Sequence, residues 1–210
     1  MKKIHIIEIS FALSLIVSVL FSVIAFGTEC NNMRNNIVRL HILANSDSAE
    51  DQEVKLIVRD TLLNYGSELF SGNLTCENAK DMLSREKEKL TELVNKTLSE
   101  KGFDYKAEIF LIKEYFTTRS YEEFTLPAGE YLALKVMLGR AEGENWWCVM
   151  FPPLCLPAAT DKEPVNVYIG DNGAEIIENY DGFEMRFKII EIYESIKNRI
   201  KNKIETNNKA

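Results

Sequence analysis

The residues of this chain that could form a nucleophilic site are Cys148, His41 and Asp47. A cysteine nucleophile requires a base that removes its proton, usually a histidine that a third group holds in place. His41 is the only histidine outside the N-terminal segment. A chain with a single such histidine can offer a Cys–His pairing by accident. We therefore interpret His41 as an ordinary strand residue. An exported thiol-dependent hydrolase that uses Cys148 and His41 is the alternative hypothesis.

Other patterns that would indicate an enzyme are missing from the sequence. It has no Gly-rich phosphate loop after a strand, no GxSxG motif and no HExxH motif. The four cysteines (Cys30, Cys76, Cys148 and Cys155) include no CxxC pair, and a zinc site would need further ligands. Whether Cys30 and Cys76 form a bridge stays open, because connectivity cannot be derived from sequence. We therefore predict no catalytic site, no metal and no cofactor.

The segment NWWCVMFPPLC, residues 145–155, combines both tryptophans of the chain with two cysteines and two prolines. In an oxidising compartment we predict a disulfide between Cys148 and Cys155, because Pro152 and Pro153 between them can reverse the chain. The alternative is a pair of buried free thiols. The predicted bridge would rigidify this segment more than it would stabilise the domain, because the loop that it closes is short.

The two tryptophans are adjacent, so in a strand their side chains would point to opposite faces. Either an exposed tryptophan beside prolines anchors a partner protein, or both tryptophans cover the core near a sheet edge. The turn from Leu126 to Gly129 joins this candidate surface, since binding residues concentrate in loops. The candidate partner contacts are Trp146, Trp147, Phe151, Pro152, Pro153 and Pro127.

The N-terminus predicts an export signal. Lys2 and Lys3 are basic, and an uncharged apolar run follows from Phe11 to Phe26. This run lies between the length of a signal-peptide apolar region and the roughly 20 residues of a spanning helix. Small residues at Ala25 and Gly27 predict cleavage after Gly27, and an uncleaved membrane anchor is the alternative.

Composition and charge restrict the class of protein. The chain has 210 residues, 46% of them hydrophobic, which is enough for one domain with a proper core. Its net charge of −7 would repel a phosphate backbone, so we predict no nucleic-acid partner. The predicted organisation is a signal peptide or anchor at 1–27, an exported domain at 28–205 and a disordered tail at 206–210.

Hydrophobic periodicity predicts the elements of this domain. Residues 37–44 alternate between an apolar face and a mixed face that carries Arg39 and His41. The other predicted elements are helices from about 48 to 70, 76 to 101 and 183 to 205, antiparallel strands at 105–116 and 131–138, and a turn at 169–173. The predicted fold is a single α+β domain, with a mostly antiparallel sheet and long packed helices, preceded by the signal or anchor segment.

Four stretches taken together resemble one family. They are RLHILANSDSAEDQEVKLIVRD (39–60), YFTTRSYEEFTLPAGEYLALKVMLG (115–139), GENWWCVMFPPLC (143–155) and FEMRFKIIEI (183–192). They are similar to stage II sporulation protein R of endospore-forming bacteria. The resemblance implies a secreted signalling protein, made in the forespore and exported across its membrane into the space between forespore and mother cell.

Proteins of that family activate a membrane-embedded aspartic protease, which removes the pro-sequence of the mother-cell sigma factor E. The resemblance therefore implies a non-catalytic activator whose partner is this protease, and it supplies no catalytic residues. The membrane would be a second partner through the N-terminal segment, before or without cleavage. A tethered structural protein of the same space is a further alternative.

Overall fold

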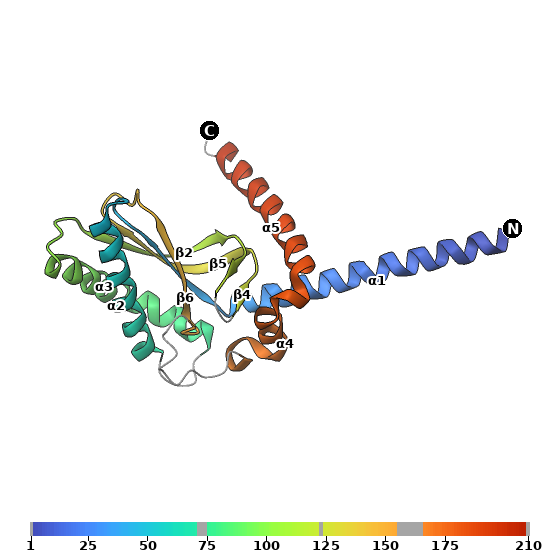
Figure 1. The fold of residues 1–210 in the computed structure, drawn as a ribbon, viewed down its shortest axis with the longest axis horizontal. Helices are drawn as coiled ribbons and strands as arrows, with labels where there is room; N and C mark the ends of the chain where they lie inside the picture. The colour runs from blue at the N-terminus through green and yellow to red at the C-terminus, as the bar shows by residue number, and fades with distance from the viewer. Residues whose placement is uncertain (1, 71–74, 122–123, 155–165, 209–210) are drawn as a thin grey trace.

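The computed structural model describes residues 2–70, 75–121, 124–154 and 166–208. Its first element, α1 (Lys2–Asn35), is one unbroken helix whose N-terminal part projects away from the rest of the protein (Figure 1). The segment His5–Asn35 is long and apolar enough to cross a membrane. The last turns of the same helix are buried in the domain, where Phe26, Cys30 and Met33 are at most 5% exposed. The domain core therefore begins inside the apolar helix.

A four-stranded sheet in the order β2-β5-β1-β6 forms the centre of the domain. Its central strand β1 (Val38–Leu43) pairs in parallel with β5 (Gly129–Leu138) and antiparallel with β6 (Asn145–Phe151). The edge strand β2 (Ala107–Phe116) pairs antiparallel with β5. The short strands β3 (Arg119–Ser120) and β4 (Thr125–Leu126) form a separate ladder between β2 and β5. The predicted α+β class with a mostly antiparallel sheet is confirmed.

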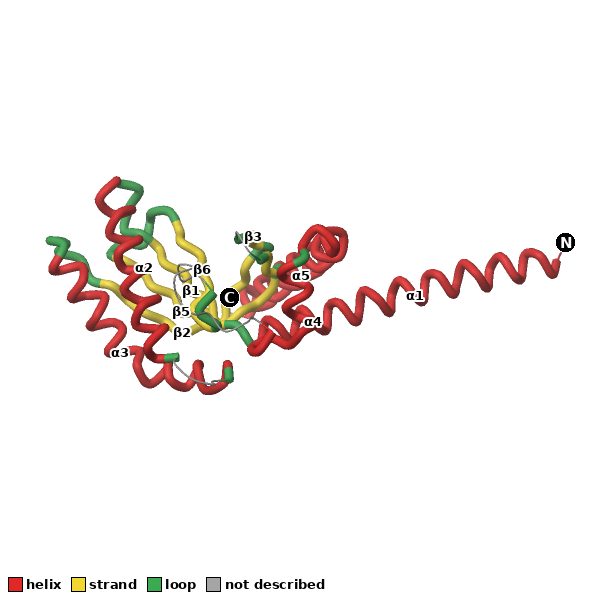
Figure 2. The backbone as a smooth tube through the Cα atoms, turned by 60° about the horizontal axis from the view of Figure 1, so that its bottom comes forward, coloured by secondary structure: helices red, strands yellow, loops and turns green. Residues whose placement is uncertain are grey.

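The two helices that the sequence predicted after the first strand cover one face of this sheet (Figure 2). Helix α2 (Ala49–Leu69) starts after Ser48, whose side chain accepts a hydrogen bond from the Asp51 backbone N–H. Helix α3 (Cys76–Glu100) starts at a capping box formed by Thr75 and Asn78. Such caps satisfy backbone donors that the first helical turn leaves free, which fixes where each helix begins.

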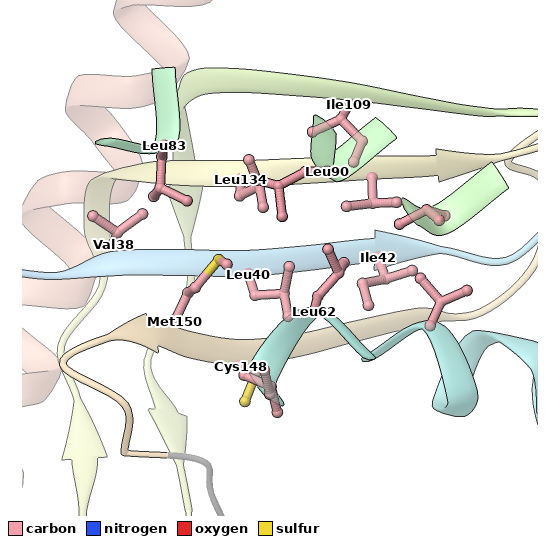
Figure 3. Packing of buried hydrophobic residues seen from close by; sticks show 14 of the residues in the cluster. Val38, Leu40, Ile42, Leu62, Leu83, Leu90, Ile109, Leu134, Cys148 and Met150 are labelled. Atoms are coloured by element: carbon pink, nitrogen blue, oxygen red, sulfur yellow. The ribbon is translucent and has the colours of Figure 1, made fainter. Parts of the chain in front are cut away.

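The main core lies between these helices and the sheet. Figure 3 shows β1 contributing alternate residues to it, while Leu62 and Leu83 approach from α2 and α3. Val38, Leu40 and Ile42, which form the apolar face predicted for this strand, are each 0% exposed. Period-two alternation therefore assigns the remaining β1 side chains, among them Arg39 and His41, to the opposite face.

The opposite face is covered over part of its length by the end of α1, by α4 (Asn166–Glu178) and by the start of α5 (Tyr180–Asn208). Helix α4 was not predicted, because the sequence from Ile169 to Gly173 reads as a turn. The helix is broken at Gly170, whose φ of 76° is readily adopted only by glycine, so the turn signal marks a break between two helical pieces.

Helix α5 differs from the prediction in its length. It continues to Asn208, into the segment that we expected to be a disordered tail. Phe187 and Ile190 are buried in the domain, whereas the apolar residues of the same helix from Tyr193 onward are exposed. These exposed residues are Tyr193, Ile196, Ile200 and Ile204.

Candidate partner-contact surface

The face of the sheet opposite α2 and α3 carries a row of four side chains, one from each strand. In the register of the sheet, His41 on β1 is opposite Lys135 on β5 and Trp147 on β6, and Lys135 is opposite Phe110 on β2. Residues directly opposite one another in neighbouring strands point to the same face. The row therefore places a histidine, a lysine and two aromatic rings side by side.

His41 is held from three directions within this row. Its Nδ1 donates to the Glu114 Oε2 at 2.8 Å, and its Nε2 lies 2.7 Å from the Asn145 Oδ1. The imidazole also stacks on the Trp147 ring, with 3.7 Å between ring centroids. Glu114 in turn accepts from the Lys135 Nζ at 2.8 Å. We refer to His41, Glu114, Lys135, Asn145 and Trp147 as the His41 cluster.

Two hydrogen bonds control the ionisation of Glu114. Partial burial by itself would raise the pKa of this carboxyl group, but the hydrogen bonds from His41 and Lys135 outweigh burial and hold the pKa below its ordinary value. Glu114 is therefore a carboxylate at neutral pH, and it joins β2 to both central strands. Neither Glu114 nor Lys135 was predicted as a site residue.

The geometry of the sheet does not support the predicted alternative of a Cys148–His41 catalytic pair. Cys148 is opposite Leu40, not His41, and its side chain lies in the core beneath α2, where it is 2% exposed (Figure 3). Because neighbouring residues of a strand point to opposite faces, the sheet separates the Cys148 sulfur from the imidazole. A base must lie within hydrogen-bond reach of its nucleophile, so this pair cannot perform thiol catalysis.

Asp47, the third residue of the predicted catalytic set, also lies away from His41. Asp47 accepts a hydrogen bond from the Glu144 backbone N–H at 2.7 Å, and it thereby fixes the loop before β6. The carboxylate that holds His41 is Glu114, which comes from a different strand. Within the described part of the chain, no group of three or more His, Cys, Asp or Glu side chains could hold a metal ion.

The two tryptophans point to opposite faces of β6, as predicted. Trp146 packs against the core beneath α2, and the Arg59 guanidinium lies 4.5 Å from its ring centroid. Trp147 is half-buried on the other face, between His41 and the Arg119 guanidinium at 5.2 Å. Of the two, Trp147 lies on the face that α2 and α3 leave uncovered.

Most of the predicted proline and phenylalanine contacts are not on the surface. Phe151 is 1% exposed, and its ring packs against Phe70 and Tyr168. Pro152 and Pro127 are also buried, while Pro153 is half-buried. The turn that contains Pro127 lies beneath α1, where neighbouring Ala128 accepts from Arg34 at 2.7 Å. A partner that binds the folded domain cannot reach Phe151, Pro152 or Pro127.

The cysteines divide into two kinds. Cys30 and Cys76 are free buried thiols, so the bridge left open between them does not exist. Cys148 is disulfide-bonded. Its predicted partner, Cys155, lies outside the described residues, and the pairing of Cys148 with Cys155 stays a prediction.

The uncovered part of the sheet is the best candidate contact surface. Phe110 and Ile112 of β2 are 40% and 37% exposed, although both belong to the central sheet. Trp147, Lys135 and Met137 are half-buried on the same face. We call these five residues the open sheet face. Partly exposed aromatic and aliphatic side chains around a charged group are typical of protein-binding surfaces.

A buried arginine lies next to the His41 cluster. Arg39 is 0% exposed, donates from Nη2 to the Tyr121 hydroxyl at 2.6 Å, and packs its guanidinium 4.4 Å from the Phe116 ring centroid. Within the described ranges, its Nη1 has no hydrogen-bond partner. Burial lowers the pKa of this guanidinium, since desolvation disfavours the charged form. In the sequence, only the position of Arg39 two residues before His41, on the same strand face, indicates that it lies next to this cluster.

The fold and this surface define a class of protein: an α+β domain that continues into an apolar N-terminal helix and leaves part of one sheet face open. Residues 34–161 match the family described as Stage II sporulation protein R, and the chain belongs to this family. It is also similar to Stage II sporulation protein R of Bacillus subtilis (strain 168), with 34% identity over 128 residues. No solved structure matches the chain.

The matched region has limits that bear on function. The alignment to the Bacillus subtilis protein covers 61% of this chain and 57% of the relative, so the chain spans just over half of that relative's length. The matched residues include the sheet, α2 and α3. Most of α1, all of α4 and all of α5 lie outside them.

Proposed function

We propose that this protein is the intercompartmental signal of endospore formation that its family resemblance implies. It is made in the forespore and exported into the space between forespore and mother cell. There it activates the membrane-embedded aspartic protease that processes the precursor of mother-cell sigma factor E. Membership in the stage II sporulation protein R family carries the proposal. The separation of His41 from Cys148 by the sheet supports an activator over a thiol hydrolase.

The open sheet face is the surface through which the protein would bind the protease. It presents Phe110 and Ile112 at the edge strand, and the His41 cluster holds the neighbouring Trp147 in one orientation. A preorganised side chain loses little conformational entropy on binding, which increases affinity. Activation additionally requires that this surface bind the active state of the protease more tightly than the inactive state.

The packing of α1 into the domain supports a signalling protein that stays attached to the membrane. Cleavage after Gly27 would cut the helix between Phe26 and Cys30, both of which are buried in the domain. It would also remove the Phe26 ring from its contacts with Phe183 and Phe187, at centroid distances of 5.7 Å each. We therefore propose that α1 remains as an anchor. Mass spectrometry of the mature protein tests this, since an N-terminus at Thr28 would contradict it.

An immunoblot of the sigma factor precursor in sporulating cells tests the signalling role. Without the gene, the precursor should persist uncleaved, and expression from a forespore-specific promoter should restore processing. The Phe110→Ser, Ile112→Ser double variant should fail to restore it at an equal protein level. Leu56→Ser is the matched control, because Leu56 is 36% exposed on α2, away from the open sheet face.

The two parts of the proposal fail separately in this experiment. Normal processing in cells that lack the gene would exclude the signalling role itself. Normal processing with the Phe110→Ser, Ile112→Ser variant would exclude the open sheet face and leave the role intact.

A further inference from the structure

Helix α5 has an exposed apolar stripe that no described part of the protein covers. Phe187, Ile190 and Glu194 are buried, so they mark the side of the helix that faces the domain. Because an α-helix has 3.6 residues per turn, positions two residues away from these lie on the opposite side. The exposed apolar residues there are Met185, Ile189, Ile192, Ile196 and Ile200, and Tyr193 and Ile204 widen the stripe laterally; all seven are 42% to 76% exposed.

Basic residues of α5 border this stripe. By helical spacing, Arg186 and Lys197 flank it on one side and Lys188 and Arg199 on the other, where these two also line a hollow beside Tyr115, while Lys203 lies within the stripe; all five are exposed. Glu191 and Glu194, by contrast, lie toward the domain side, where Glu194 is 4% exposed. An outward apolar stripe bordered by cations is the pattern of a helix that lies in a membrane interface, where long basic side chains reach the lipid headgroups.

The position of α5 relative to α1 agrees with this pattern. Phe183 and Phe187 pack against Phe26, which ends the uncharged apolar run of α1, and the Arg186 guanidinium lies 5.8 Å from the Phe26 ring centroid. Figure 1 shows α5 leaving α1 at this point and running across the end of the domain. When α1 spans the membrane, α5 therefore starts at the membrane surface.

We propose that the outer stripe of α5 binds the surface of an anionic lipid membrane, as a second membrane contact beside α1. Two observations favour lipid over a protein occupant: four cations lie at the edges of the stripe, and α5 begins beside the end of the apolar run of α1. This inference uses α1 as the membrane helix, but it does not depend on activation of the protease.

Depth-dependent fluorescence quenching of the full chain in lipid nanodiscs tests the proposal. An environment-sensitive fluorophore is attached at Ile196→Cys on the stripe or, as the matched control, at Asn202→Cys on another exposed side of the same helix. The native thiols Cys30 and Cys76 are buried, which favours labelling at the introduced cysteine. Nanodiscs contain phosphatidylcholine alone or mixed with phosphatidylglycerol, together with a lipid that carries a shallow nitroxide quencher.

We expect several-fold stronger quenching at position 196 than at position 202 in the phosphatidylglycerol mixture. Replacement of Arg199 and Lys203 by Gln should reduce the difference between the two lipid compositions. Equal quenching at both positions, or water-like emission at position 196, would overturn the proposal. A third outcome is a label at position 196 that is shielded from water but not quenched, with shielding that increases with protein concentration. This outcome would overturn the lipid proposal and assign the stripe to contact with a second copy of the chain.

Discussion

Arg34 at the end of α1 and Glu194 in α5 form an ion pair, with 3.0 Å between Nη2 and Oε1, in which both side chains are only 5% exposed. The same guanidinium donates from Nη1 to the Ala128 carbonyl at 2.7 Å. Arg34 therefore joins the end of α1, the entry to β5 and the C-terminal helix. Gly129 permits this approach, because a Cβ atom there would lie 2.7 Å from the arginine side chain.

Removal of the carboxylate should destabilise the domain strongly. Glu194→Ala leaves Arg34 buried without its counter-charge, which costs about 3–5 kcal/mol of unfolding free energy. Lys197→Ala is the control: its ammonium also lies 3.4 Å from Glu194 but is 55% exposed, so we expect little change. Thermal melts of the full chain in detergent, followed by tryptophan fluorescence, compare the two, and equal melting temperatures would contradict this role of the ion pair.

The His41 cluster should make stability depend on acid pH. The folded pKa of Glu114 lies below its ordinary value of 4.5, so its carboxylate contributes stability that is fully present above 4.5. This contribution is lost as pH falls through the folded pKa, because the protonated group can no longer accept both hydrogen bonds. Glu114→Gln should lower stability at pH 7 and flatten its decline below pH 4.5. An unchanged acid titration of the melting temperature would count against the cluster.

Arg39 should be dispensable for stability. Among the described residues Arg39 bonds the Cys148 carbonyl and the Tyr121 hydroxyl but no carboxylate, and replacement of buried ionic groups by apolar residues of similar volume is often neutral or stabilising. Arg39→Met should therefore raise the unfolding free energy by about 1 kcal/mol or leave it unchanged. Arg39→Lys should lower it, since lysine cannot bond both the Cys148 carbonyl and the Tyr121 hydroxyl in the same geometry. A large loss in Arg39→Met would show that the two hydrogen bonds outweigh the desolvation of the charge.

Thiol counting tests the predicted disulfide. In denaturant without reductant we expect two reactive thiols, Cys30 and Cys76, and after reduction all four cysteines of the chain. Peptide mapping under non-reducing conditions should then find Cys148 joined to Cys155. A Cys155→Ser variant should titrate with three thiols in denaturant. Four thiols before reduction would exclude the bridge.

The sequence predicts those elements whose signals are local. Ser48 and Thr75 are caps that define helix starts within a few residues, and the alternation around Leu40 separates an apolar from a mixed strand face. For α5 the sequence predicts a helix but not which side of it is buried, because apolar residues lie on two sides of the helix. Spacing shows that stripes exist, whereas the packing of Phe26 against Phe187 decides which of them is covered.

The site depends on contacts that sequence spacing does not specify. His41 meets Glu114 and Lys135 because three strands far apart in the chain take a particular register. The adjacent tryptophans predict two opposite faces, but only the positions of α2 and α3 identify Trp147 as the one on the open side. Burial of Phe151 and Pro127 likewise follows from tertiary packing, which a turn or aromatic motif does not reveal.

The parallel pairing of β1 with β5 delays formation of the sheet until late in synthesis of the chain. Val38 pairs with Leu132 and Phe151, so the central strand has no neighbour until most of the chain has been synthesised. Contacts so distant in sequence form late and slowly. If the chain crosses a membrane from its N-terminus while it is being synthesised, the sheet remains unformed until β5 and β6 have followed. Assembly of the sheet is then completed only on the far side, which prevents the open sheet face from forming in the compartment of origin.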